Sequence, residues 1–75
     1  MDELTAEEQA QLDKAFTYHA PKGDQPEKYT ALRYQAKDLA RAIILSSPSS
    51  RERALAITNL EQSIMWANAA IARNT

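Results

Sequence analysis

The C-terminal stretch, residues 49–73, most constrains the fold, because its pattern is helical and its apolar residues lie on two sides. One stripe repeats at alternating spacings of three and four, which at about 100° per residue puts its members on one face: Ile57, Leu60, Ile64, Ala67 and Ile71. Leu55, Trp66 and Ala69 project from the opposite side. A single partner helix covers only one of these faces. We therefore expect an all-α protein that assembles as a homo-oligomer.

A second helix is expected over residues 26–46, with an apolar stripe of the same period: Tyr29, Leu32, Ala36, Leu39 and Ile43. Pro26 suits its first turn, and Pro48 ends it, because the residue before a proline is pushed out of the α region. Ser49 and Glu52 then predict a capping box for the next helix. The connection is short, so residues 26–46 and 49–73 are predicted to form an antiparallel two-helix hairpin.

A short acidic helix is predicted over residues 1–16, with Thr5 and Glu8 as its capping box. Leu12 and Phe16 form an i,i+4 apolar pair, helped by Leu4 and Ala15, and we expect this helix to dock onto the hairpin. Residues 17–25 form the one real loop, because this segment contains Pro21 and the single glycine. The chain is therefore predicted to be one helical domain, residues 1–75.

Composition narrows the functional classes. The chain of 75 residues has one histidine and no cysteine, which argues against a disulfide scaffold and a zinc-type site, and no metal or other cofactor is expected. His19, the one candidate general base, is interpreted as a loop hydrogen-bonding residue, so no enzymatic activity is expected. No apolar run approaches the roughly 20 residues of a membrane span, and the start does not resemble a signal peptide. The net charge of −1 argues against duplex DNA as a partner.

Charge is unevenly distributed along the chain. Five acids precede the first base, whereas residues 14–75 hold nine bases and five acids. Repeated around an oligomer, this surplus favours small anions, although a normally solvated surface also explains it. Lys28, Thr30 and Arg33, near the start of the second helix, suit a phosphate site. The same combination of residues also occurs at many ordinary helix starts that bind nothing. Tyr18 offers a flat face on which a nucleobase can stack. Arg73, at the end of the last helix, reaches the start of the second helix if the antiparallel helices are not staggered.

Four ordered motifs carry a resemblance to a known family: F-T-Y-H-x-P at residues 16–21, Y-x-x-L-R at 29–33, S-R-E-R-A-L-A at 50–56 and M-W-A-N-A-A-I-A-R at 65–73. The chain resembles the phage anti-CBASS protein 2 family, which shares its helical hairpin with an anti-Thoeris sponge. The resemblance implies a hexamer in the cytoplasm of the infected bacterium. It also implies that the protein sequesters cyclic dinucleotides and cyclic trinucleotides without degrading them, so that CBASS effectors are not activated.

The resemblance further implies two kinds of pocket, one between paired protomers for dinucleotides and one where three protomers meet for trinucleotides. Tyr18 is the best match for the family's base-stacking aromatic, and either Lys28 or Arg33 matches its phosphate-binding residue. Thr30 and Arg73 are the candidates for the trinucleotide pocket. The alternative hypothesis is a structural or protein-binding helical oligomer, such as a small phage adaptor, without a nucleotide ligand.

Overall fold

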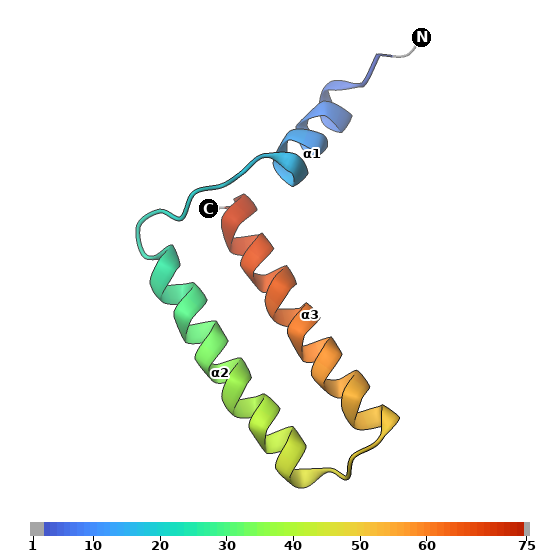
Figure 1. Ribbon diagram of the computed structural model, residues 1–75. Coiled ribbons are helices and arrows are strands. Elements are labelled where there is room, and N and C mark those ends of the chain that lie inside the picture. Colours follow the sequence, from blue (N-terminus) through green and yellow to red (C-terminus); the bar gives the residue numbers. More distant parts are fainter. Residues whose placement is uncertain (1–2, 75) are drawn as a thin grey trace.

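The computed structural model describes residues 3–74 and contains three helices: α1 (Ala6–Phe16), α2 (Gln25–Ser46) and α3 (Arg51–Asn74). Figure 1 shows α2 and α3 running antiparallel as a hairpin, with α1 beyond the end where α2 begins and α3 ends. The predicted all-α hairpin with a preceding short helix is therefore confirmed. Asp2, which belongs to the acidic leader, lies outside the described residues.

The first helix begins as its sequence predicts but does not pack as expected. Thr5 and Glu8 form the reciprocal capping box, with both backbone-to-side-chain bonds at 3.0 Å. Leu12 and Phe16 do not make the expected contact with the hairpin, because they remain 42% and 84% exposed. The last turns of α1 approach α3 through a different side of the helix, which carries Ala15.

The turn between α2 and α3 moves the start of the last helix from the predicted residue 49 to residue 51, and its cap from Ser49 to Ser50. The helix begins at Arg51, and Ser50 rather than Ser49 supplies the capping hydroxyl, which accepts the Arg53 amide at 3.1 Å. The Ser50 carbonyl also accepts the Ala54 amide, the first hydrogen bond of the helix, at 3.1 Å. The chain reverses direction through Pro48 and Ser49, so helical geometry starts only after both residues.

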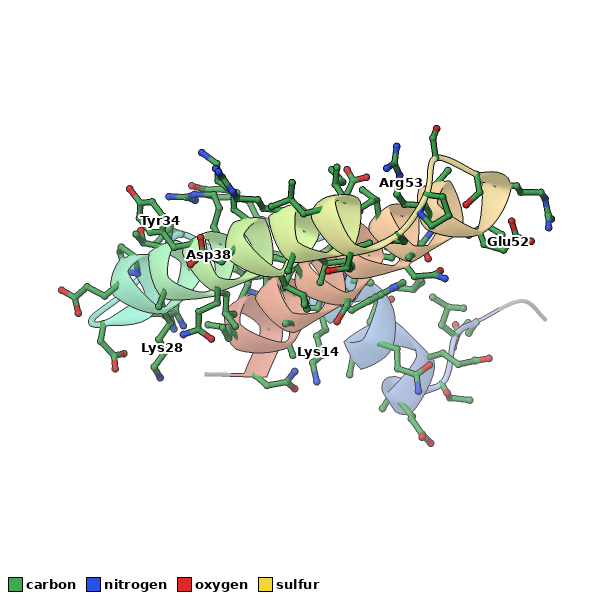
Figure 2. The ribbon with its side chains drawn as sticks, turned by 90° about the horizontal axis from the view of Figure 1, so that it is seen from below. Lys14, Lys28, Tyr34, Asp38, Glu52 and Arg53 are labelled. Atoms are coloured by element: carbon green, nitrogen blue, oxygen red, sulfur yellow. The ribbon has the colours of Figure 1, made fainter. Side chains whose placement is uncertain are left out.

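Arg53 fastens this turn to the end of α2, where Figure 2 shows it beside the connecting loop. Its Nη1 donates to the carbonyls of Ile44, at 3.3 Å, and Ser47, at 3.1 Å. Carbonyls at the end of a helix have no hydrogen-bond donor within the helix, so the guanidinium of Arg53 supplies the donors that the backbone lacks.

Replacing Arg53 with methionine should therefore destabilise the hairpin. We expect Arg53→Met to lower the free energy of unfolding by about 1 to 2 kcal/mol, because two hydrogen bonds from a charged, partly exposed donor are lost. Urea denaturation followed by circular dichroism measures this change. Arg53→Lys keeps the charge but not the planar group, so its free energy of unfolding should lie between those of the wild type and Arg53→Met. An unchanged midpoint for Arg53→Met would contradict the role of this contact.

The hairpin interface is too narrow to bury an apolar side chain completely. Among residues 3–74, no hydrophobic residue is fully buried, and the two stripes are only half-buried. Leu39, predicted to lie within the stripe of α2, is 53% exposed, so the packing against α3 leaves it largely uncovered. The molecule measures 54 × 34 × 13 Å, so in its thinnest direction it is little more than one helix thick.

The second apolar face stays uncovered within one chain. Trp66 is 68% exposed, and other large apolar side chains share this exposure: Tyr34, Leu45, Leu55 and Met65. Exposed apolar side chains of this kind are typical of association surfaces, and the oligomer remains a prediction. Within the described part of the chain, no helix is long and apolar enough to cross a membrane.

Candidate ligand-binding site

A cavity of about 530 Å³ lies at the open end of the hairpin, where α2 begins and α3 ends. Residues from the end of α1, the loop and both long helices line it: Ala15, Thr17, Tyr18, His19, Tyr29, Arg33, Asn68, Ala69, Ala72 and Arg73. Three of the five predicted site residues, Tyr18, Arg33 and Arg73, therefore meet in one place. The unstaggered antiparallel arrangement that Arg73 required is observed.

Gln25 holds the loop and the two helix ends in this register. It is the one buried residue among those described, 5% exposed, and its side chain is hydrogen-bonded on both sides. Its Oε1 accepts the backbone amide of Lys22 at 3.0 Å, and its Nε2 donates to the carbonyl of Ile71 at 3.4 Å. Gly23 adopts a φ of 54°, a left-handed conformation that suits glycine, which lets the loop turn into α2.

His19 positions the segment that carries Tyr18. The imidazole Nε2 lies 3.0 Å from the carbonyl of Lys14, and since a carbonyl only accepts, Nε2 is the donor in this bond. The bond caps the end of α1 and agrees with the interpretation of His19 as a loop hydrogen-bonding residue. The neighbouring Tyr18 is left 84% exposed, so its ring is free to contact a ligand.

Two guanidinium groups give the cavity its charge. Arg33 comes from α2 and Arg73 from the last turn of α3, and no acidic side chain among residues 3–74 forms an ion pair with either. Arg33 Nη2 donates to the Thr30 hydroxyl at 3.4 Å, and that hydroxyl donates to the carbonyl of Pro26 at 2.9 Å. Thr30 therefore steers Arg33, while its own side chain lines a separate hollow on α2.

Lys28 lies outside the cavity. Its Nζ pairs with Asp24 at 3.5 Å on the exposed surface, and Figure 2 shows it projecting from α2 on a different side from Tyr34. The sequence left Lys28 and Arg33 as equal candidates for phosphate binding. Since five residues on a helix turn the side chain by about 140°, both cannot face one cavity. The structure places Arg33 in it.

Asn68 is a cavity residue that the sequence analysis did not select. Its Oδ1 is buried and has no hydrogen-bond partner within the described part of the chain. A buried acceptor without a partner costs about 1 to 3 kcal/mol, and this one lines the cavity together with Arg33 and Arg73. Its place in the M-W-A-N motif gave no signal of this, because helix position alone does not reveal a missing partner.

Removing this orphaned acceptor should stabilise the protein. Asn68→Leu, which is similar in size, is expected to raise the free energy of unfolding by about 1 kcal/mol. If Asn68 serves the ligand, the same change weakens ligand binding, so stability and binding move in opposite directions. Thermal denaturation and calorimetry measure the two effects. Asn68→Asp, which keeps the shape of the side chain and adds a negative charge, is the control. A lower free energy of unfolding for Asn68→Leu than for the wild type would contradict this explanation.

The cavity combines cations and flat rings. Within residues 3–74, no cluster of three or more His, Cys, Asp or Glu side chains is placed to hold a metal ion. The guanidinium groups suit phosphate, and an exposed tyrosine suits a nucleobase. The fold and site together define a small all-α hairpin protein with a site suited to binding anions.

The chain belongs to a family that fits this class. The model of the Acb2/Tad1 hairpin domain matches residues 8–72, most of the chain. This hairpin is shared by the anti-CBASS protein Acb2 and the anti-Thoeris protein Tad1, which are non-catalytic phage sponge proteins. No curated protein and no solved structure matches the chain in the other two comparisons. The predicted family is confirmed.

Proposed function

We propose that this protein is a phage anti-defence sponge that binds cyclic dinucleotides and cyclic trinucleotides in the cytoplasm of the infected bacterium. By sequestering these messengers intact, it prevents activation of CBASS effectors. The observation that carries the proposal is the convergence of Tyr18, Arg33 and Arg73 on one cavity in which no acidic side chain pairs with the cations. Membership of a sponge family supports it.

The binding chemistry follows from the cavity residues. A guanidinium meets a phosphodiester through two parallel N–H donors, and each charge-assisted bond contributes about 1.5 to 3 kcal/mol before desolvation is subtracted. Stacking of a base on Tyr18 adds about 1 to 3 kcal/mol. Arg33 is already oriented by Thr30, so less side-chain entropy is lost when the ligand binds. These contacts bind the ligand and leave its bonds unchanged.

Symmetry explains how one small chain serves two ligands. A cyclic dinucleotide has approximate two-fold symmetry, which matches a pocket on a two-fold axis between paired protomers. A cyclic trinucleotide has three-fold symmetry, which matches a junction of three protomers. A homohexamer with D3 symmetry would contain both kinds of axis, and the exposed apolar face around Trp66 favours assembly.

The alternative is a structural or protein-binding oligomer, such as a phage adaptor, in which that apolar face binds a helix of another protein.

One experiment separates the possibilities. The protein is incubated with a cyclic dinucleotide, freed of unbound ligand and heat-denatured, and the supernatant is analysed by chromatography. A sponge releases intact ligand, an enzyme releases product, and an adaptor releases nothing. Arg33→Ala should release almost no cyclic dinucleotide. Lys28→Ala, which changes a residue outside the cavity, should release as much cyclic dinucleotide as the wild type.

A further inference from the structure

The open end of the hairpin depends on non-covalent contacts for its register. The turn that contains Pro48 joins α2 to α3 at the closed end, whereas Figure 1 shows that no turn links the start of α2 to the end of α3. No hydrophobic residue among residues 3–74 is buried, so apolar packing, which has no preferred direction, specifies the stagger of the two helices only weakly. A directional contact at the open end can set this stagger.

Gln25 supplies such a contact and joins three segments. Its backbone amide donates to the Lys22 carbonyl at 2.9 Å, and its Oε1 accepts the Lys22 amide at 3.0 Å, so two bonds close the turn before α2. Its Nε2 donates to the carbonyl of Ile71 at 3.4 Å, in the last turn of α3. We call these three hydrogen-bonded residues, Lys22, Gln25 and Ile71, the Gln25 clamp.

The Gln25 clamp lies between the segments that form the ligand cavity. Tyr18 belongs to the loop that the clamp closes, Arg33 lies about two turns along α2, and Arg73 lies in the last turn of α3. If α3 slipped by one residue against α2, Arg73 would move about 1.5 Å along the helix axis and turn by about 100°. The clamp therefore decides whether the three side chains share one cavity.

We propose that Gln25 is a positioning residue for the ligand site, and that ligand affinity depends on both hydrogen bonds of its side chain. Gln25 is not among the residues that line the cavity, so it acts through the segments that it holds. One side-chain atom must accept from Lys22 while the other donates to Ile71, which an amide does. The inference rests on the proposed function, because the ligand is taken to be a cyclic nucleotide.

Gln25→Glu tests this requirement, because its side chain keeps the shape and gains or loses a donor with pH. A protonated carboxyl accepts with one oxygen and donates with the other, as the amide does, whereas a carboxylate only accepts. An ordinary glutamate titrates near about pH 4.3, and burial favours its neutral form. The carboxyl introduced at this buried position should therefore lose its proton between about pH 4 and about pH 8.

Calorimetry with a cyclic dinucleotide measures affinity across this range. At about pH 8, Gln25→Glu should bind at least about tenfold more weakly than the wild type, because the donor to Ile71 is lost. At about pH 4, where the donor returns, its affinity should lie within about threefold of the wild-type value. Gln35→Glu, which adds the same charge at an exposed position of α2, is the matched control and should follow the wild type throughout.

Arg53→Met separates positioning from stability. This variant weakens the hairpin at its closed end, where Arg53 contacts Ile44 and Ser47, and leaves the clamp intact. Its folded form should bind the cyclic dinucleotide with wild-type affinity, although its free energy of unfolding is lower. Equal loss of affinity in Arg53→Met and in Gln25→Glu would mean that stability alone controls binding, and the proposal would be overturned.

NMR spectra without ligand distinguish failure of this proposal from failure of the proposed function. In Gln25→Glu, the backbone amide signals of Tyr18 and Arg73 should shift with one pH midpoint that the wild type and Gln35→Glu lack. If they do so while the wild type binds no cyclic nucleotide, the proposed function is wrong and the clamp still positions the cavity residues. Signals that do not follow this titration, or an affinity that low pH does not restore, would contradict the positioning role.

Discussion

Tyr18→Ala is expected to weaken binding of a cyclic dinucleotide at least about 30-fold and to leave binding of a cyclic trinucleotide nearly unchanged. A pocket on a two-fold axis presents Tyr18 twice, so one substitution removes two stacking contacts of at least about 1 kcal/mol each. The exposure of Tyr18, 84%, means that the substitution removes little packing within the chain. Lost affinity therefore reports the ligand contact rather than unfolding.

Arg73→Ala is expected to show the opposite selectivity, because a three-fold junction presents this guanidinium three times to a cyclic trinucleotide. Titration calorimetry with both ligands on both variants measures the comparison, with Lys28→Ala as the charge-matched control outside the cavity. Tyr18 and Arg73 line the same cavity of one protomer. Equal loss of both ligands in either variant would mean that this single cavity serves both, and the two-pocket assignment would be refuted.

Trp66→Ala is expected to reduce the oligomeric mass as well as the stability. Trp66 is 68% exposed in the isolated chain and lies on the side of α3 away from the hairpin contact. If a neighbouring subunit covers it, truncation of the indole to alanine costs about 3 to 5 kcal/mol per buried site. Analytical ultracentrifugation of wild type and variant measures the mass, and thermal denaturation at several concentrations measures the linked stability.

The control for Trp66→Ala is a variant that weakens the hairpin without touching the apolar face. Arg53→Met removes the contacts to Ile44 and Ser47 at the far end of the molecule and should lower stability while leaving the mass unchanged. Loss of mass in Trp66→Ala alone would then locate the effect at the subunit contact. A monomeric wild-type protein would contradict the prediction and the assembly argument with it.

Local sequence determined the elements of this protein. The capping box of Thr5 and Glu8 depends on residues three apart and forms as predicted. The end of α2 at Ser46 follows from steric exclusion by Pro48, which acts on its immediate neighbour. The hairpin follows because two stripes of equal period joined by a short turn can bury each other only by packing antiparallel. These effects act within a few residues, or through one repeated pattern, and are readable without coordinates.

Only the tertiary structure decided which candidate residues meet. Arg73 is forty residues from Arg33 along the chain, and the two share a cavity because the turn at Pro48 and the anchoring of Gln25 to Ile71 set the stagger of the helices. Lys28 falls outside because the rotation of α2 turns it away. The orphaned oxygen of Asn68 and the exposure of Phe16 are likewise invisible in the sequence, since both depend on what surrounds a side chain in three dimensions.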